Sequence, residues 1–153
     1  MSTYKVTVEG VALPGPVEVK SKPWYMLGFM FPSGEGVTIG GVVYLNDLGS
    51  QEILSHEFKH VWQQRNYPGG PTKWLLRYLS DGSFRRGQEF EAYCVQCQCL
   101  RFKYGPQSIQ YAQMKAVTMS MTGYSAAQVK TALDALWAAF PSKPCVAYSV
   151  VGG

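Results

Sequence analysis

Two histidines and one glutamate are spaced as the ligands and the base of a metal-dependent hydrolase. In SHEFKHVWQQ, residues 55–64, His56 and His60 lie four positions apart and Glu57 follows the first. On a helix, side chains at i and i+4 lie one above the other, so both imidazoles can reach one metal ion. Glu57 is rotated by about 100° from His56, where its carboxylate can take a proton from metal-bound water. The pattern predicts one zinc ion per chain.

A chance match to this five-residue pattern is the alternative explanation. It is weakened because His56 and His60 are the chain's only histidines. Phe58 and Val61 also give the segment the period of an amphipathic helix, which would anchor the face opposite the histidines.

Two histidines leave a tetrahedral zinc ion without its third protein ligand, while the fourth position is kept for water. The extended pattern HExxHxxGxxH would need a glycine and a histidine where this chain has Gln63 and Asn66. That subclass is excluded. The third ligand must therefore be a glutamate, an aspartate or a cysteine from elsewhere in the chain.

The segment GQEFEAYC, residues 87–94, offers the best third ligand. Glu89 is followed one helical turn later by Ala92, and a small residue there lets two helices approach closely enough to share a metal ion. Glu91 lies on a different face of the same helix and is the alternative ligand. Asp81 and the cysteines remain as weaker candidates.

The surrounding elements predict an α+β arrangement within one domain spanning residues 1–153, because strands come first and helices follow. Residues 1–48 alternate polar and apolar side chains and form mainly strands. Residues 50–140 have mainly helical periodicity, and residues 141–153 form an apolar tail that is a last strand or an arm. The expected elements are extended runs at 24–31 and 37–45 around a turn at 32–36, a motif helix from about 50, a short helix after 72, a turn at 81–87, and helices at 89–105, 108–122 and from 126.

A glycine pair and a capping box add detail to this arrangement. Gly40 and Gly41, inside the run 37–45, are expected to permit a bulge or a close backbone approach. Ser125 and Gln128 have the spacing of a capping box at the start of the last helix.

Composition excludes several classes of partner. The net charge of +4 is mild and forms no basic stripe, so we expect no nucleic-acid binding. The first residues lack the basic and apolar regions of a signal peptide, and no apolar run reaches 18 residues, so we expect a cytoplasmic protein without membrane contact. Cys94, Cys97 and Cys99 lack a fourth metal ligand nearby and are expected to be buried free thiols.

Residues 37–93 resemble the gluzincin metallopeptidases, especially the small single-domain kind found in bacteria and their phages. The resemblance lies in VTIGGVVYL, SHEFKHVWQQ, WLLRYL and EFEAY. In gluzincins the third ligand begins the pattern E-x-x-[AS]-[DN], which matches Glu89 and Ala92 but meets Tyr93 where many members carry Asp or Asn. The family also implies that an edge strand binds the substrate backbone by strand addition. Its residues here would be Gly41, Val42, Val43 and Tyr44.

The sequence therefore predicts zinc-dependent hydrolysis of a peptide or protein substrate, with Glu57 as general base on zinc-bound water. Four side chains are candidates for stabilising the developing oxyanion: Tyr67, Arg77, Tyr78 and Tyr93. The alternative is a catalytically silent zincin-fold module with a structural or binding role, for example in a phage particle or a secretion assembly. A phage-encoded chain would lie in a virion or the host cytosol.

Overall fold

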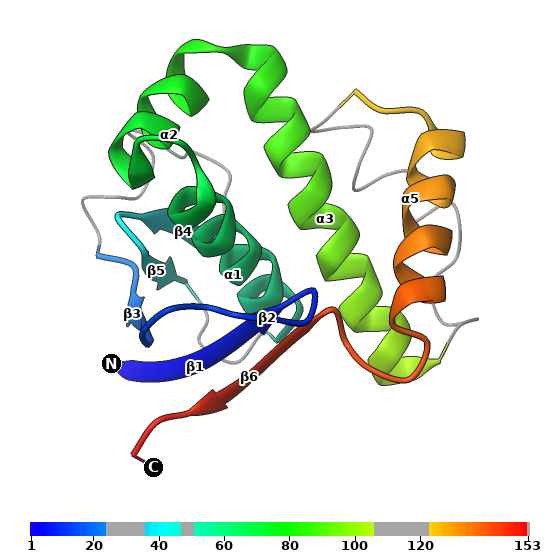
Figure 1. Cartoon of the computed structure of the whole chain (residues 1–153), viewed down its shortest axis with the longest axis horizontal. Coiled ribbons are helices and arrows are strands. Elements are labelled where there is room, and N and C mark those ends of the chain that lie inside the picture. Colours follow the sequence, from blue (N-terminus) through cyan, green and yellow to red (C-terminus); the bar gives the residue numbers. More distant parts are fainter. Residues whose placement is uncertain (24–35, 47–50, 106–122, 153) are drawn as a thin grey trace.

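The computed structural model describes residues 1–23, 36–46, 51–105 and 123–152. Within these residues an N-terminal sheet precedes four helices, which confirms the α+β class (Figure 1). The extended run expected at 24–31, the turn at 32–35 and the helix at 108–122 lie outside the described residues.

Among the described residues, six strands form one mixed sheet. They are β1 (Ser2–Val8), β2 (Val11–Ala12), β3 (Val17–Ser21), β4 (Gly36–Ile39), β5 (Val42–Leu45) and β6 (Val146–Val150). The order is β2-β1-β3-β5-β4, and β6 pairs with β1. β3 and β5 are parallel, whereas the other pairs are antiparallel. The C-terminal tail is thus a last strand over 146–150, one of its two expected forms.

One face of the sheet is buried because its strands alternate with a period of two. The inward side chains are Val6, Val8, Val17, Val19, Val43 and Leu45, each at most 3% exposed. Lys5, Glu18 and Lys20 occupy the alternating positions on the opposite face and remain in contact with solvent.

The bulge expected at Gly40 and Gly41 is wrong, because φ values of 60° and 80° place both residues in a turn between β4 and β5. The other form expected for them, a close backbone approach, is not contradicted, since the Gly41 N–H donates to Gln64 Oε1 at 3.3 Å. A second expectation about residues 37–45 is wrong. The segment Gly41–Tyr44 is also no edge strand, because β5 is hydrogen-bonded to β3 on one side and β4 on the other. Among the described strands, β4 ends this side of the sheet.

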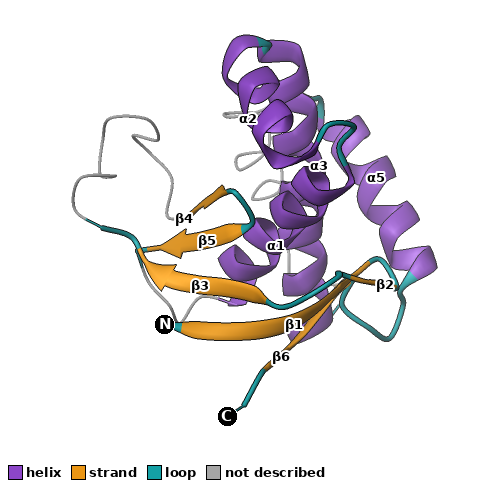
Figure 2. Cartoon of the chain, turned by 60° about the vertical axis from the view of Figure 1, so that its left-hand side comes forward, coloured by secondary structure: helices purple, strands orange, loops and turns teal. Residues whose placement is uncertain are grey.

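The described helices all lie on one side of the sheet (Figure 2). They are α1 (Gln51–Asn66), α2 (Gly70–Ser80), α3 (Gly82–Tyr104) and α5 (Ala126–Ala139). The capping box expected before α5 is confirmed, with Ser125 and Gln128 bonded reciprocally. No helix in the described ranges combines the length and apolarity needed to cross a membrane.

The turn expected at 81–87 is wrong, because α3 already begins at Gly82. Asp81 is its N-cap and accepts a hydrogen bond from the Phe84 backbone N–H at 3.0 Å. Phe84 then packs edge-on against Tyr67 and Trp74. Capping and these aromatic contacts offset the low helix propensity of Gly82 and Gly87.

Helix α1 is enclosed between the sheet and α3 and is buried on both sides. Leu54, Phe58 and Val61 pack into the sheet's core cluster, and all are at most 4% exposed. The Phe58 ring meets Tyr4 of β1 and Tyr148 of β6, with centroids 5.7 and 5.1 Å away. Anchoring this face turns the motif histidines away from the sheet and towards α3.

Candidate metal centre

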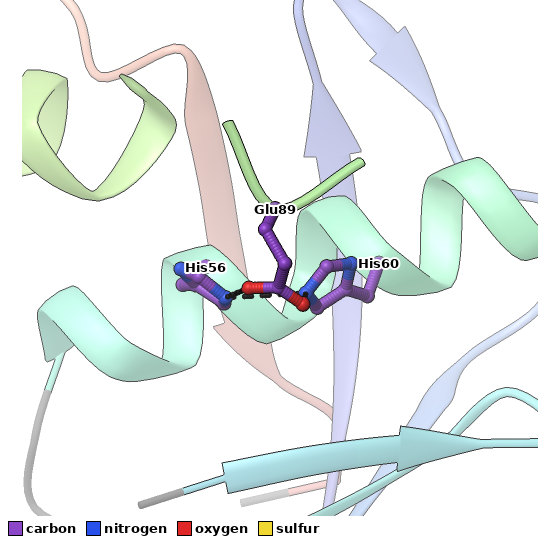
Figure 3. A group of neighbouring side chains, drawn as sticks. All are labelled: His56, His60 and Glu89. Atoms are coloured by element: carbon purple, nitrogen blue, oxygen red, sulfur yellow. Dashed lines mark hydrogen bonds and ion pairs between the residues drawn. The ribbon is translucent and has the colours of Figure 1, made fainter. Parts of the chain in front are cut away.

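His56, His60 and Glu89 bring three ligand atoms together between α1 and α3 (Figure 3). The His56 Nε2 atom lies 3.3 Å from one Glu89 oxygen, and the His60 Nε2 atom lies 3.2 Å from the other. The two Nε2 atoms are 3.1 Å apart. All three ligand atoms fall within 4.8 Å of one another, so a single metal ion could contact them together.

Glu89, and not Glu91, lies in one group with the two histidines. Ala92 is fully buried, as a close approach of α1 and α3 requires. The Glu91 carboxylate instead accepts a hydrogen bond from Gln63 Nε2 at 2.9 Å and lies 4.0 Å from Lys59 Nζ. Asp81 is occupied as the α3 cap.

The protonation of His60 follows from the hydrogen bonds around Gln63. The Gln63 amide nitrogen donates to the Gln88 backbone oxygen and to the Glu91 carboxylate, at 3.0 and 2.9 Å. Its oxygen therefore faces the imidazole and accepts from His60 Nδ1 at 2.8 Å. With a proton held at Nδ1, Nε2 is the His60 nitrogen directed at the site, and its lone pair becomes free for a metal ion when the second ring proton leaves.

His56 is oriented in the same way by a second glutamine. Its Nδ1 lies 3.1 Å from Gln96 Oε1, two turns beyond Glu89 on α3. Tyr93, which stands where the resemblance implies Asp or Asn, presents its ring edge-on to His56 with centroids 4.6 Å apart. Gln96 thus supplies the hydrogen-bond acceptor for His56 that the resemblance would place at position 93.

The three converging groups fit a bound cation, because two imidazole lone pairs and one carboxylate would otherwise face one another without a positive charge. In the metal-free chain that charge is a proton. Burial lowers the pKa of His60, but the Glu89 carboxylate and then Glu57 raise it to about 9. Burial raises the pKa of Glu89, yet His60 and His56 hold it well below its usual value.

Of the four candidates for oxyanion stabilisation, Tyr78 of α2 is the one that contacts both Glu89 and His60. Its hydroxyl donates to Glu89 Oε1 at 2.5 Å. Burial, followed by the Glu89 charge, raises its pKa far above the usual value, so the phenol stays a proton donor. Tyr67 and Arg77 bond to each other at 3.3 Å and do not join this group.

Glu57 is 4% exposed and sits on the side of α1 that faces β4. It is not a member of the ligand group. It follows His56 directly on α1, and its carboxylate accepts a hydrogen bond from the Thr38 hydroxyl of β4 at 2.7 Å. Its charge is one of the smaller causes that raise the pKa of His60 and of Tyr78. A carboxylate next to a metal ion but not bound to it is where a general base belongs.

The cysteines are separate from this centre. All four are buried free thiols, as expected for Cys94, Cys97 and Cys99. Burial raises the pKa of Cys94 and Cys145 to about 12 and of Cys97 to about 11. Thiols that hold their protons this firmly are poor nucleophiles.

Sequence reasoning missed three polar residues that contact the site. Gln63 lies one turn after His60, and Gln96 lies two turns after Glu89, so helical spacing could have identified both as facing the metal centre. Thr38 bonds the Glu57 carboxylate from strand β4. No local pattern links residues so far apart in the chain.

Comparison of this chain with protein families, with curated proteins and with solved structures finds no match.

Proposed function

We propose that this chain is a small zinc-dependent metallopeptidase with a zincin-like, gluzincin-type arrangement. The observation that carries the proposal is the convergence of His56, His60 and Glu89, with Glu57 buried beside them. Two imidazoles and a carboxylate are the ligand set of several catalytic zinc sites. A structural zinc site is usually closed by a fourth protein ligand, and among the described residues this group has only three.

The chain's own residues supply the remaining chemistry. A zinc ion held by the three ligands would polarise the scissile carbonyl and acidify water. Glu57 takes a proton from the attacking water and passes it to the leaving amine. Tyr78 is a protonated phenol whose single proton is donated to Glu89 in the metal-free chain. With Glu89 bound to the metal ion, the phenol would turn this proton to the carbonyl oxygen as negative charge develops there. Because β5 is paired on both sides and cannot take up another strand, the substrate backbone would pair with β4, the outer described strand on this side of the sheet.

One observation favours the alternative, a zincin-fold module in which the metal ion holds the structure. His56 and His60 are only 7% and 5% exposed, so little of either ring meets solvent. The Glu89 side chain, at 16%, is more open.

The deciding experiment combines metal analysis with hydrolysis of unfolded casein, with and without a chelator. The wild-type chain should carry zinc and cleave casein, and chelation should abolish cleavage. Glu57→Gln is the matched variant, because it keeps the side-chain shape but removes the base. It should retain zinc and lose hydrolysis. A zinc-loaded wild type that leaves casein intact would favour the structural module, and a Glu57→Gln protein without zinc would refute the assigned roles.

A further inference from the structure

The Glu57 carboxylate is held by a strand that is remote from it in sequence. The Thr38 hydroxyl on β4 donates to Glu57 Oε2 at 2.7 Å, and the Glu57 backbone oxygen lies 3.2 Å from the same hydroxyl. A hydroxyl has one proton to donate, and the shorter contact to a charged acceptor is the stronger bond. Thr38 is 5% exposed, so water does not compete freely for this bond.

Gly36, on the same face of β4, leaves the space that the carboxylate occupies. A Cβ atom at Gly36 would lie 2.8 Å from Glu57 Oε1 and 2.9 Å from its Cγ. It would also lie 2.7 Å from the Leu45 side chain. Each separation is closer than non-bonded carbon and oxygen atoms approach. The Glu57 side chain is thus bonded on one oxygen and closely packed on the other.

Gln64 fixes β4 against α1, so that Thr38 itself has little freedom to move. This fully buried amide donates from Nε2 to the Thr38 backbone oxygen at 2.8 Å and accepts from the Gly41 N–H at 3.3 Å. Gln64 follows Glu57 by two helical turns, which places both on the side of α1 that meets the β4–β5 hairpin.

We infer that Thr38 is a positioning residue for the general base Glu57, with Gly36 providing the space that the base requires. The inference rests on the proposed function. A buried carboxylate bonded through one oxygen has a fixed plane, so its other oxygen keeps one direction for accepting the proton. Without the hydroxyl the carboxylate can rotate, and small misplacements of a reacting group are costly in rate.

The test compares Thr38→Val, which keeps the shape and removes the hydroxyl, with Thr38→Ser, which keeps the hydroxyl. On fluorescein-labelled casein, Thr38→Val should lower kcat by about 10- to 100-fold, less than the full contribution of a general base. KM and zinc affinity should stay near the wild-type values. Thr38→Ser should restore kcat to within a few-fold. Equal losses of kcat in both variants, or none in Thr38→Val, would overturn the inference.

A second readout does not depend on activity. Cobalt can replace zinc in such sites, and its visible spectrum reports the geometry around the ion. The cobalt-loaded Thr38→Val protein should shift towards the spectrum of Glu57→Gln, while Thr38→Ser should match the wild type. A wild type that binds cobalt but cleaves no casein refutes the peptidase proposal, and the spectra then show whether Thr38 orients the Glu57 carboxylate beside the ion. An unchanged Thr38→Val spectrum refutes that role.

Folding is checked by thermal unfolding of each variant. Should Thr38→Val fail to fold, Thr38→Ala removes the hydroxyl without a branched side chain and takes its place in both assays. If neither variant unfolds cooperatively, Thr38 has a purely structural role and the inference is wrong.

Discussion

Exchanging Glu89 for glutamine tests the metal centre most directly, because Glu91 provides a matched control on the same helix. The two Glu89 oxygens lie 3.3 and 3.2 Å from the ligand nitrogens of His56 and His60. Glu89→Gln keeps the shape but removes the charged ligand. Loss of a residue that only supports a ligand costs about 10- to 100-fold in affinity. Loss of the ligand itself should therefore cost more than about 100-fold, or about 2.8 kcal/mol.

Glu91→Gln should cost less than about 10-fold. Glu91 contacts the site only through Gln63, which also donates to the Gln88 backbone oxygen at 3.0 Å. The Glu91 side chain is 49% exposed, so water can replace it as an acceptor.

Zinc affinity is measured for both variants by competition with a chromophoric chelator, together with thermal unfolding of the metal-free proteins. The two Glu→Gln changes remove the same charge, so a general electrostatic effect would weaken both equally. Greater zinc loss from Glu91→Gln than from Glu89→Gln would move the third ligand by two residues and refute the assignment.

Three other outcomes follow from the same centre. Emission spectroscopy should find close to one zinc ion per chain, and a second equivalent would contradict a single three-ligand site. Metal-free protein should lose stability as pH rises from about 6.5 to about 9. Burial lowers the pKa of His60, but Glu89 raises it to about 9, and His60 forms an ion pair with Glu89 only while it is protonated. Thermal unfolding across this range would show no such loss if the pair were absent. Replacing Gln63 or Gln96 by leucine should weaken zinc binding by about 10- to 100-fold in the chelator assay, and unchanged affinity would show that neither amide orients its histidine.

Strands and helices were predictable where their hydrophobic periodicity can be recognised from neighbouring residues alone. The alternation in β1 and β3 and the helical spacing in α1 place the same side chains inward that the structure buries. The predictions that were wrong all involve glycines. Because Gly40 and Gly41 form a turn, residues 37–45 are two strands and not one, and β5 lies inside the sheet. Gly82 is a poor helix former, and the helix begins there only because of the Asp81 cap and aromatic contacts from α2.

The grouping of His56, His60 and Glu89 was predictable for a related reason. The spacing of His56 and His60 places both side chains on one face of a single helix. The choice of Glu89 needed only the position of Ala92 on a second helix. Both arguments use geometry within a helix. The sequence does not predict which residues of other elements contact the site. Thr38 bonds Glu57 from strand β4, and Tyr78 bonds Glu89 from α2.

The position of Tyr93 shows how a resemblance can differ in one residue and still keep the underlying requirement. An imidazole that binds metal through Nε2 needs an acceptor at Nδ1, because that bond fixes the tautomer and the ring plane. Asp or Asn at position 93 would meet this need, and here Gln96 meets it at 3.1 Å. Gln63 does the same for His60 at 2.8 Å. Both acceptors are neutral amides, so Glu89 supplies the negative charge in direct contact with the two histidines. A divalent ion would keep a net positive charge there, which favours polarising a carbonyl over merely holding the helices together.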